Sequence, residues 1–256
     1  MIDVGQGDAI AVRTPNGRWL LVDAGVRNDR LDMGARRVVP YLLRAGARRL
    51  DALILSHPDA DHIGGAASVL RAFRVSAVLD PGVPAASVQY LETLHAAELD
   101  AARWLAPRAG NELVVDGVQL RFLSPTERSL DGTGDPNDLS LVFRLSYGSF
   151  AALFPGDAPQ AVEARIAAEH GPDLAATVLK VGHHGSRTAT APALLQAVQP
   201  RLALISVGAE NRYGHPAAEV LARLVRQGAS VLRTDQHGDL VIRAWRSGRV
   251  QLGTTR

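Results

Sequence analysis

The stretch that decides the fold is Ser56-His57-Pro58-Asp59-Ala60-Asp61-His62-Ile63-Gly64-Gly65. An apolar run over residues 50–55 precedes it and predicts a buried strand, and residues 63–73 have the pattern of a helix. In the loop between them, His57 and Asp59 stand at alternate positions, so their side chains can point the same way and hold one metal ion. Asp61 and His62 face differently and could hold a second metal ion.

A solvated acidic turn is the alternative interpretation of this stretch, because aspartate is favoured in the first turn of a helix. However, four ligand-type side chains directly after an apolar strand are costly unless something satisfies them. The pair Gly64-Gly65 also weakens the alternative, because glycine lowers helix propensity but lets a neighbouring backbone approach closely. We therefore expect a metal site here.

Three further motifs place polar side chains at strand ends or turns. Gly156-Asp157 follows an apolar run, and its carboxylate could bridge two cations roughly 3.5–4 Å apart, as in two-metal hydrolytic sites. Lys180-Val181-Gly182-His183-His184-Gly185-Ser186 holds adjacent histidines, whose side chains diverge. One of them is expected to be a ligand and the other a proton donor or phosphate contact. Tyr213-Gly214-His215-Pro216 places a histidine on a turn before a helix.

The composition limits the chemistry of the site. The 256 residues include no cysteine, so a metal ion must be held by histidine, aspartate, glutamate or weaker oxygen donors. The formal net charge is only +2, and Lys180 is the only lysine among 28 basic residues. Arginine suits bidentate phosphate contacts, but a GC-rich genome explains the arginine content equally well. The charge permits a nucleic-acid partner without requiring one.

No internal repeat, low-complexity tract or linker divides the chain, so we expect one domain over residues 1–256. No apolar stretch approaches the ~20 residues that cross a bilayer. The sequence opens as though inside a strand, which suggests a piece of a longer protein that could itself be membrane-bound.

Periodicity and turn signals predict the secondary structure. Strands are expected at residues 9–12, 19–22, 50–55, 75–79, 113–123 (a hairpin), 139–145, 149–154, 178–181, 202–207, 231–233 and 240–244. Helices are expected at residues 35–45, 63–73, 88–105, 160–170, 192–197 and 216–227. Early hairpins followed by alternating strands and helices indicate an α/β protein with two sheets covered by helices.

Together these motifs resemble the metallo-β-lactamase superfamily over nearly the whole chain, and most of all the nuclease-like C-terminal domain of ComEC-type DNA-uptake competence proteins. The resemblance also rests on Ile2-Asp3-Val4-Gly5-Gln6-Gly7-Asp8, Leu21-Val22-Asp23-Ala24-Gly25, Asn137-Asp138-Leu139-Ser140-Leu141-Val142, Pro155-Gly156-Asp157 and Ser206-Val207-Gly208. It implies a four-layer αββα fold, with two mixed sheets sandwiched between helices. Asp59 stands where the superfamily's usual motif has histidine, a change that ComEC-like members share.

The resemblance further implies two divalent metal ions. The extra carboxylate and the lack of thiolate favour Mn²⁺, with Mg²⁺ or Zn²⁺ as alternatives. The implied ligands of the first ion are His57, Asp59 and bridging Asp157, and those of the second are Asp61, His62, Asp157 and His183. A water activated by the ions would attack phosphorus. The stretch before Asp157 lacks the histidine common in the superfamily, so one ion is expected to be held partly by substrate.

Other residues take supporting roles in this interpretation. The candidates for phosphate contact or proton transfer are His184, Ser186 and His215, with Asp61 as a further catalytic candidate. Asn137 and Ser140, together with Ser186 and His215, are candidates for substrate binding. Asp23 is expected to orient a ligand from behind.

The leading hypothesis is a metal-dependent nuclease that degrades one strand during DNA uptake, with DNA, expected to be single-stranded, as substrate. A ComEC-like parent would be embedded in the bacterial membrane with this domain on the extracytoplasmic side. One alternative is a small-molecule phosphodiesterase or phosphocholine esterase, and another is a non-catalytic DNA-binding domain with a vestigial metal site. β-Lactamase activity is not expected, because the cysteine and the second motif histidine that many such enzymes use are missing.

Overall fold

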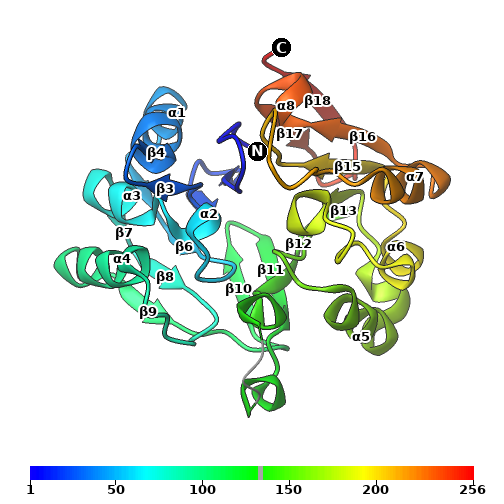
Figure 1. The fold of residues 1–256 in the computed structure, drawn as a ribbon, viewed down its shortest axis with the longest axis horizontal. Coiled ribbons are helices and arrows are strands. Elements are labelled where there is room, and N and C mark those ends of the chain that lie inside the picture. The colour runs from blue at the N-terminus through cyan, green and yellow to red at the C-terminus, as the bar shows by residue number, and fades with distance from the viewer. Residues whose placement is uncertain (132–134) are drawn as a thin grey trace.

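In the computed structural model, which describes residues 1–131 and 135–256, two sheets pack against each other between two layers of helices (Figure 1). Helices on one side are α1 (Val39–Arg44), α3 (Ala66–Ala72) and α4 (Val88–Leu99). Helices on the other side are α5 (Gln160–His170), α6 (Pro192–Val198) and α7 (Ala218–Arg226). The αββα architecture expected from the sequence is therefore confirmed.

The first sheet is formed by the N-terminal part of the chain. Its strands lie in the order β1 (Ile10–Arg13), β2 (Trp19–Val22), β6 (Ala52–Ile54), β8 (Ala77–Leu79) and β9 (Arg103–Leu105). Only β1 and β2 pair antiparallel; the remaining pairs are parallel. The carboxyl ends of β2, β6 and β8 therefore meet at one edge, which is where the loop after β6 begins.

The second sheet is formed by the C-terminal part. Its strands lie in the order β10 (Glu112–Val115), β11 (Val118–Ser124), β12 (Val142–Tyr147), β13 (Phe150–Phe154), β14 (Val178–Lys180), β15 (Leu202–Ile205) and β16 (Ser230–Arg233). The strands from β10 to β13 pair antiparallel, and those from β13 to β16 pair parallel. The parallel strands β13 and β14 thus direct residues 155–157 and 181–186 to the same edge.

Short elements complete the fold. They are β3 (Arg27–Asn28), β4 (Leu31–Asp32), a π-helical turn (Gly34–Val38), β5 (Arg49–Leu50), α2 (Ala60–Ile63), β7 (Arg74–Val75), 3-10 turns (Glu127–Asp131, Pro136–Leu139, Gly171–Leu174, Gly182–Gly185), α8 (Thr234–His237), β17 (Leu240–Ala244) and β18 (Val250–Thr254). Strands β17 and β18 form a separate antiparallel pair.

Three apolar cores follow from the layers. One lies between the first sheet and its helices and contains Leu53 and Leu70. The middle core lies between the two sheets, where Phe143 and Phe154 stack with ring centroids 4.8 Å apart. The third lies between the second sheet and its helices and contains Leu179. Because each sheet is covered on both faces, the central strands contain consecutive apolar residues rather than an alternating pattern.

Turn chemistry explains the predicted hairpins. Asp116 and Gly117 both have positive φ (52° and 76°), which is the conformation that a two-residue primed turn requires. Gly17 closes the first hairpin, where its N–H donates to Thr14 O at 3.0 Å. Gly148 (φ 60°) forms the turn between β12 and β13. These three hairpins are confirmed.

Some predicted boundaries are wrong. The helix expected over residues 88–105 ends at Leu99, and residues 103–105 form β9, because pairing with β8 outweighs the helical spacing. The helix expected over 63–73 is two helices, α2 and α3, separated by Gly64 and Gly65. The strand expected over 139–145 begins only at Val142, after a 3-10 turn. Strand β18 and helix α8 were not predicted from the sequence.

The close approach expected at the paired glycines is present. A Cβ added to Gly65 would lie 2.3 Å from Ala24 O and 2.5 Å from Gly34 Cα. One added to Gly64 would lie 2.3 Å from Arg27 N. Only glycine lets these backbones touch, so the pair fixes α2 against the first sheet's loops.

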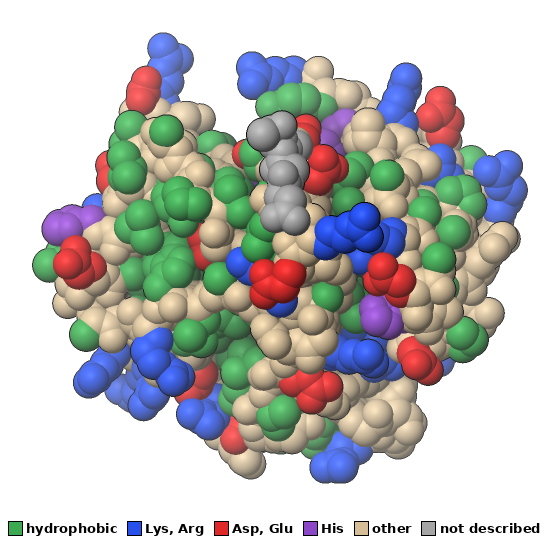
Figure 2. Space-filling view, turned by 90° about the horizontal axis from the view of Figure 1, so that it is seen from below, with side chains coloured by type: hydrophobic (Ala, Val, Ile, Leu, Met, Phe, Trp, Pro, Cys, Tyr) green, Lys and Arg blue, Asp and Glu red, His purple; other side chains and the backbone are tan. Residues whose placement is uncertain are grey.

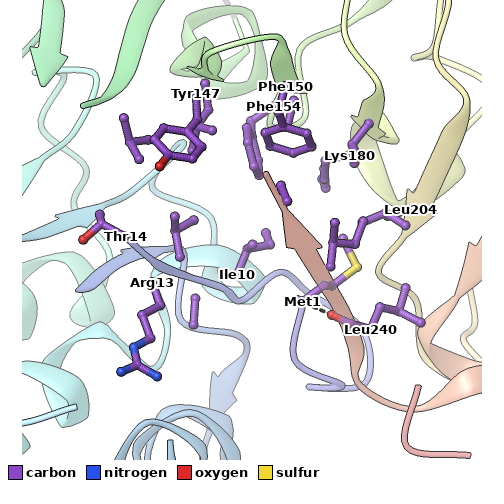
Figure 3. Close-up of a pocket in the computed structure, with 18 of the residues that line it drawn as sticks. Met1, Ile10, Arg13, Thr14, Tyr147, Phe150, Phe154, Lys180, Leu204 and Leu240 are labelled. Carbon is purple, nitrogen blue, oxygen red and sulfur yellow. Dashed lines mark hydrogen bonds between the residues drawn. The ribbon is translucent and has the colours of Figure 1, made fainter. Parts of the chain in front are cut away.

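A cavity of about 510 Å³ lies between the two sheets (Figure 3). Phe150 and Phe154 face Ile10 and Met1 across it, and Lys180 reaches its wall from β14. Apart from Lys180, the residues that line the cavity lie outside the motifs that contain the candidate metal ligands. Among the helices of the described residues, none has the length and apolarity needed to span a membrane.

Candidate metal centre

The loop after β6 delivers the first set of candidate ligands. His57 is 1% exposed, and Asp59 precedes helix α2 in extended conformation (φ −73°, ψ 147°). Asp61 and His62 lie in the helix, and His62 is fully buried. The rings of His57 and His62 lie 4.1 Å apart, so the extended residue and the helical one converge on the same space.

Loops of the second sheet bring the remaining candidates to this space. Asp157, which follows β13, places Oδ1 3.4 Å from His62 Nε2. Its Oδ2 lies 3.6 Å from His183 Nε2 and 3.7 Å from His184 Nε2. The ligand atoms of His57, His62 and Asp157 all lie within 4.8 Å of one another, as do those of Asp61, His62 and His184. The site is therefore assembled from both sheets.

Hydrogen bonds fix the orientation of the buried imidazoles. His62 donates from Nδ1 to Asp23 Oδ2 at 3.0 Å, and His184 donates from Nδ1 to Ser206 O at 2.9 Å. Ser56 Oγ donates to Asp23, so it accepts from His57 Nδ1 at 3.0 Å. With Nδ1 as the donor in each ring, Nε2 is the atom that faces the shared space, and it can bind a metal ion once it carries no proton.

Several buried polar atoms around this space have no hydrogen-bond partner, although some lie close to a neighbouring carboxylate. They are Asp8 Oδ1, His57 Nε2, His62 Nε2, Asp157 Oδ1 and His184 Nε2. Buried polar atoms are normally hydrogen-bonded, and each exception needs an explanation. Five aspartates (8, 23, 59, 61 and 157) also gather here against one lysine. Imidazole nitrogens without a hydrogen-bond partner, beside several carboxylates, form a donor set suited to divalent cations, so the residues fit the metal ions implied by the sequence.

The two adjacent histidines have different surroundings. Both have positive φ (48° for His183 and 52° for His184), which turns the chain sharply. His184 is 1% exposed and its Nε2 lies 3.2 Å from Asp61 Oδ2. The side chain of His183 is 30% exposed, its Nδ1 lies 3.3 Å from Thr188 Oγ1, and its nearest carboxylate is Asp157. The sequence interpretation made His183 the ligand, whereas the geometry brings His184 closer to Asp61.

The other candidate residues lie at the rim of the site or behind its candidate ligands. Asp59 is half-exposed, with Oδ2 3.6 Å from His57 Nε2. His215 contacts His183 edge-to-face, with ring centroids 5.9 Å apart. Ser186 is buried and hydrogen-bonds Thr188 Oγ1 at 2.9 Å. Asn137 and Ser140 each hold a buried side-chain oxygen without a partner.

Sequence reasoning assigned no role to Asp8 or Lys180. Lys180 is 3% exposed, forms an ion pair with Asp8, and its Nζ lies 3.7 Å from Asp157 Oδ1. Asp8 Oδ1 lies 3.5 Å from His184 Nδ1. The signal was present in the sequence, because Lys180 is the only lysine in an otherwise arginine-based chain.

Charge interactions overcome desolvation at the centre. Burial alone would raise the pKa of Asp157, but His62, His184 and Lys180 hold it well below the usual value. Burial alone would lower the pKa of Lys180, but Asp8 and Asp157 raise it. The carboxyl of Asp157 therefore stays ionised and Lys180 stays charged. By contrast, burial and the neighbouring His183 lower the pKa of His215, which favours its neutral form.

Figure 2 shows one face of the molecule, on which the lysine and arginine side chains of the described residues form several separate groups, at the outline and within the face, rather than one patch. Any attraction for a polyanion on this face is therefore diffuse.

Comparison with known proteins identifies the family. The family model described as "Metallo-beta-lactamase superfamily" matches residues 2–209. The chain belongs to the metallo-β-lactamase superfamily. Members of this superfamily are generally metal-dependent hydrolases, in agreement with the donor set described above.

Competence proteins are among the relatives of this superfamily member. The chain is 34% identical to ComE operon protein 3 of Bacillus subtilis over 255 residues, which is 95% of this chain and 32% of that protein. It is 37% identical to competence protein ComA of Neisseria gonorrhoeae over 247 residues, 96% of this chain and 32% of that protein. The resemblance noted in the sequence is confirmed, and the chain spans about a third of the length of these relatives.

Solved structures share the fold. The metallo-β-lactamase fold protein YhfI from Bacillus subtilis superposes with a TM-score of 0.59 at 14% identity, covering 98% of both chains. The diiron β-hydroxylase CmlA from Streptomyces venezuelae gives a TM-score of 0.59 at 13% identity, covering 90% of this chain and 51% of that one.

Proposed function

We propose that this chain is a metal-dependent phosphodiester hydrolase that acts on DNA. The observation that carries the proposal is the convergence of unpaired Nε2 atoms on the buried carboxylate of Asp157. Similarity to a competence protein supports DNA as the substrate class. Degradation of one strand during uptake is the specific activity that we propose.

Some of the residues would bind the metal ions, and others would hold those ligands in position. His57, Asp59 and Asp157 would hold one divalent ion, and Asp61, His62, Asp157 and His184 the second, with His183 at its edge. Bound ions would lower the pKa of water and neutralise charge on the phosphate. Lys180, paired with Asp8, would hold the Asp157 carboxylate in position, and Asp23 would hold the His62 ring. His215 and Ser186 are proposed to contact the phosphate, and His215, in its neutral form, to exchange a proton there.

Manganese is the proposed ion. The ligands comprise three carboxylates and no sulfur, and such oxygen-rich sites suit Mn²⁺ or Mg²⁺ better than thiolate-containing sites do. Histidine ligands also suit Zn²⁺, so metal content is measured together with activity.

The test is incubation of linear single-stranded DNA with the purified chain and Mn²⁺, Mg²⁺ or Zn²⁺. Asp61→Ala is expected to lower the cleavage rate by at least ~100-fold, since even the partners behind a ligand are worth ~10–100-fold. Asp29→Ala is the matched control, because Asp29 is exposed at the β3–β4 turn and lies outside the ligand cluster. Equal cleavage by Asp61→Ala and wild type would show that a contaminant cuts the DNA and would refute the proposal.

The alternatives give different results in the same assay. Turnover of a chromogenic phosphodiester with DNA left intact would identify a small-molecule esterase. Stoichiometric metal and DNA binding without cleavage would identify a non-catalytic domain. Either outcome would overturn the nuclease proposal while leaving the metal site in place.

A further inference from the structure

The loop over residues 208–215 presents an exposed aromatic ring beside the metal centre. Tyr213 is 56% exposed, and its ring stacks on His215 with centroids 5.7 Å apart and planes 18° from parallel. His215 in turn contacts His183, whose Nε2 lies 3.6 Å from Asp157 Oδ2. A row of three rings therefore leads from the Asp157 carboxylate to solvent, and Tyr213 is its outer end.

The side chain of Asn211 holds this loop in shape. Its Nδ2 donates to Gly208 O at 3.0 Å and to His215 O at 2.7 Å. Its Oδ1 accepts from the backbone N–H groups of Tyr213 (3.2 Å) and His215 (3.0 Å). Because one amide satisfies four backbone groups, the ring of Tyr213 is pre-oriented, and a ligand that stacks on it need not order the loop.

Positive charge accompanies the ring. The guanidinium of Arg212 lies 5.2 Å from the centroid of Tyr213 and donates to its hydroxyl at 3.1 Å. Arg187 follows the His183–His184 turn; its side chain is 73% exposed, and its Nε lies 3.8 Å from Glu219 Oε2 in an exposed ion pair. An aromatic ring accompanied by exposed arginines is a combination that binds single-stranded nucleic acid, where bases stack and arginines contact phosphates.

We propose that Tyr213 is a stacking subsite for an unpaired nucleobase, which positions the neighbouring phosphodiester at the metal centre. The proposal rests on the proposed function and specifies its substrate as single-stranded DNA or the frayed end of a duplex. Inside a duplex both faces of a base are already stacked, so a base must leave the helix to use the ring. Arg212 is exposed and can leave the ring for a phosphate when a base takes its place. Stacking tolerates any base, so the subsite selects strandedness and not sequence.

The experiment measures binding without cleavage. The full 256-residue chain in EDTA is titrated with a fluorescent single-stranded oligonucleotide, with the same strand in a duplex, and with the same strand carrying one abasic residue at successive positions. Tyr213→Ala removes the ring and Tyr213→Phe keeps it. Tyr147→Ala is the matched control, because Tyr147 also lies under an arginine (Arg246, 5.4 Å) but lines the cavity between the sheets. Melting temperatures verify that each variant is folded.

Tyr213→Ala is expected to lower the affinity for the single strand by roughly 5- to 150-fold, which is the contribution of one base–aromatic stack to binding. Tyr213→Phe and Tyr147→Ala should stay within about twofold of wild type. One abasic position should weaken wild type by the same factor and have no effect on Tyr213→Ala.

Two results would overturn the proposal: unchanged affinity of Tyr213→Ala, or an equal loss of affinity for every abasic strand in both proteins. Absence of measurable single-strand binding by wild type would overturn it as well. If the stacking pattern appears without cleavage after metal is added, the subsite stands and the nuclease proposal fails. If DNA is cleaved while Tyr213→Ala binds normally, the nuclease proposal stands and the subsite fails.

Discussion

Glu163, a buried acid on helix α5, makes the pH dependence of stability a test of the structure. Its side chain is 0% exposed; Oε2 accepts a hydrogen bond from Ala191 N at 2.6 Å, and Oε1 has no partner. Burial raises the pKa of Glu163 from 4.5 to about 7, although the N–H of Ala191 opposes the rise. Above pH 7 the folded protein therefore contains a buried carboxylate that unfolding would release into water. The substitution Glu163→Gln keeps the acceptor and removes the charge.

The size of the effect follows from the two pKa values. Below pH 4.5 both folded and unfolded chains carry the proton, so Glu163 contributes no pH dependence. Between 4.5 and about 7 only the folded chain keeps the proton, so stability falls as the pH rises. The free energy of unfolding falls by about 3 kcal/mol in total, and the full decrease is reached above pH 7. Glu163→Gln should therefore match wild type at pH 4 and exceed its free energy of unfolding by about 3 kcal/mol at pH 8.

Urea unfolding at intervals from pH 4 to pH 8, with the metal removed, measures this difference. Glu169→Gln is the matched control, since Glu169 lies on the same helix in an exposed ion pair with Arg165. Its difference from wild type should stay within about 1 kcal/mol across the range. A pH-independent difference for Glu163→Gln, or a less stable variant at pH 8, would refute the assignment of a protonated buried carboxyl.

Further predictions concern the metal, the glycine contact and the core. Mn²⁺ at 100 times its Kd should raise the free energy of unfolding by about 2.7 kcal/mol, and His62→Ala should abolish the increase; an equal increase in both proteins would contradict the ligand assignment. Gly65→Ala should cost about 1–3 kcal/mol or more, because its Cβ would meet Ala24 O at 2.3 Å, whereas Gly253→Ala, whose Cβ meets only Val241 at 4.0 Å, should be close to neutral; equal melting temperatures would count against the backbone contact. Phe143→Ala should lower the free energy of urea unfolding by about 3–5 kcal/mol because it empties the space between the sheets, and a loss below about 1 kcal/mol would show that the core collapses around the gap.

The fold was predictable where the signal is local. Asp116-Gly117 encodes its turn in two residues, and the hairpin on either side of it follows. The failure at residues 103–105 has the opposite origin. That segment is a strand because it pairs with β8 and because Trp104 Nε1 donates to Asp80 at 2.9 Å, contacts that helical spacing cannot reveal. Tertiary pairing overrode local propensity there.

The candidate site was likewise predictable only in part from the sequence. Residues 57–62 and Asp157 could be found as motifs because strand ends and ligand-type side chains coincide in the sequence. The direction of His183 and His184 could not be found, because it depends on positive φ at two non-glycine residues, which no pattern encodes. The pairing of Lys180 with Asp8 joins opposite parts of the chain and becomes visible only in the folded structure.

The division of the ligands between the two sheets has a consequence for how the protein matures. Residues 57–62 come from the first sheet and Asp157 with His184 from the second, so more than half of the chain must be folded and docked before the donors meet. Such long-range contacts form late, after the entropy of closing the intervening segment has been overcome. A nascent or misfolded chain therefore cannot assemble the full ligand set. The candidate metal centre is therefore complete only once both halves of the chain have folded and docked, which couples metal binding to the last stage of folding.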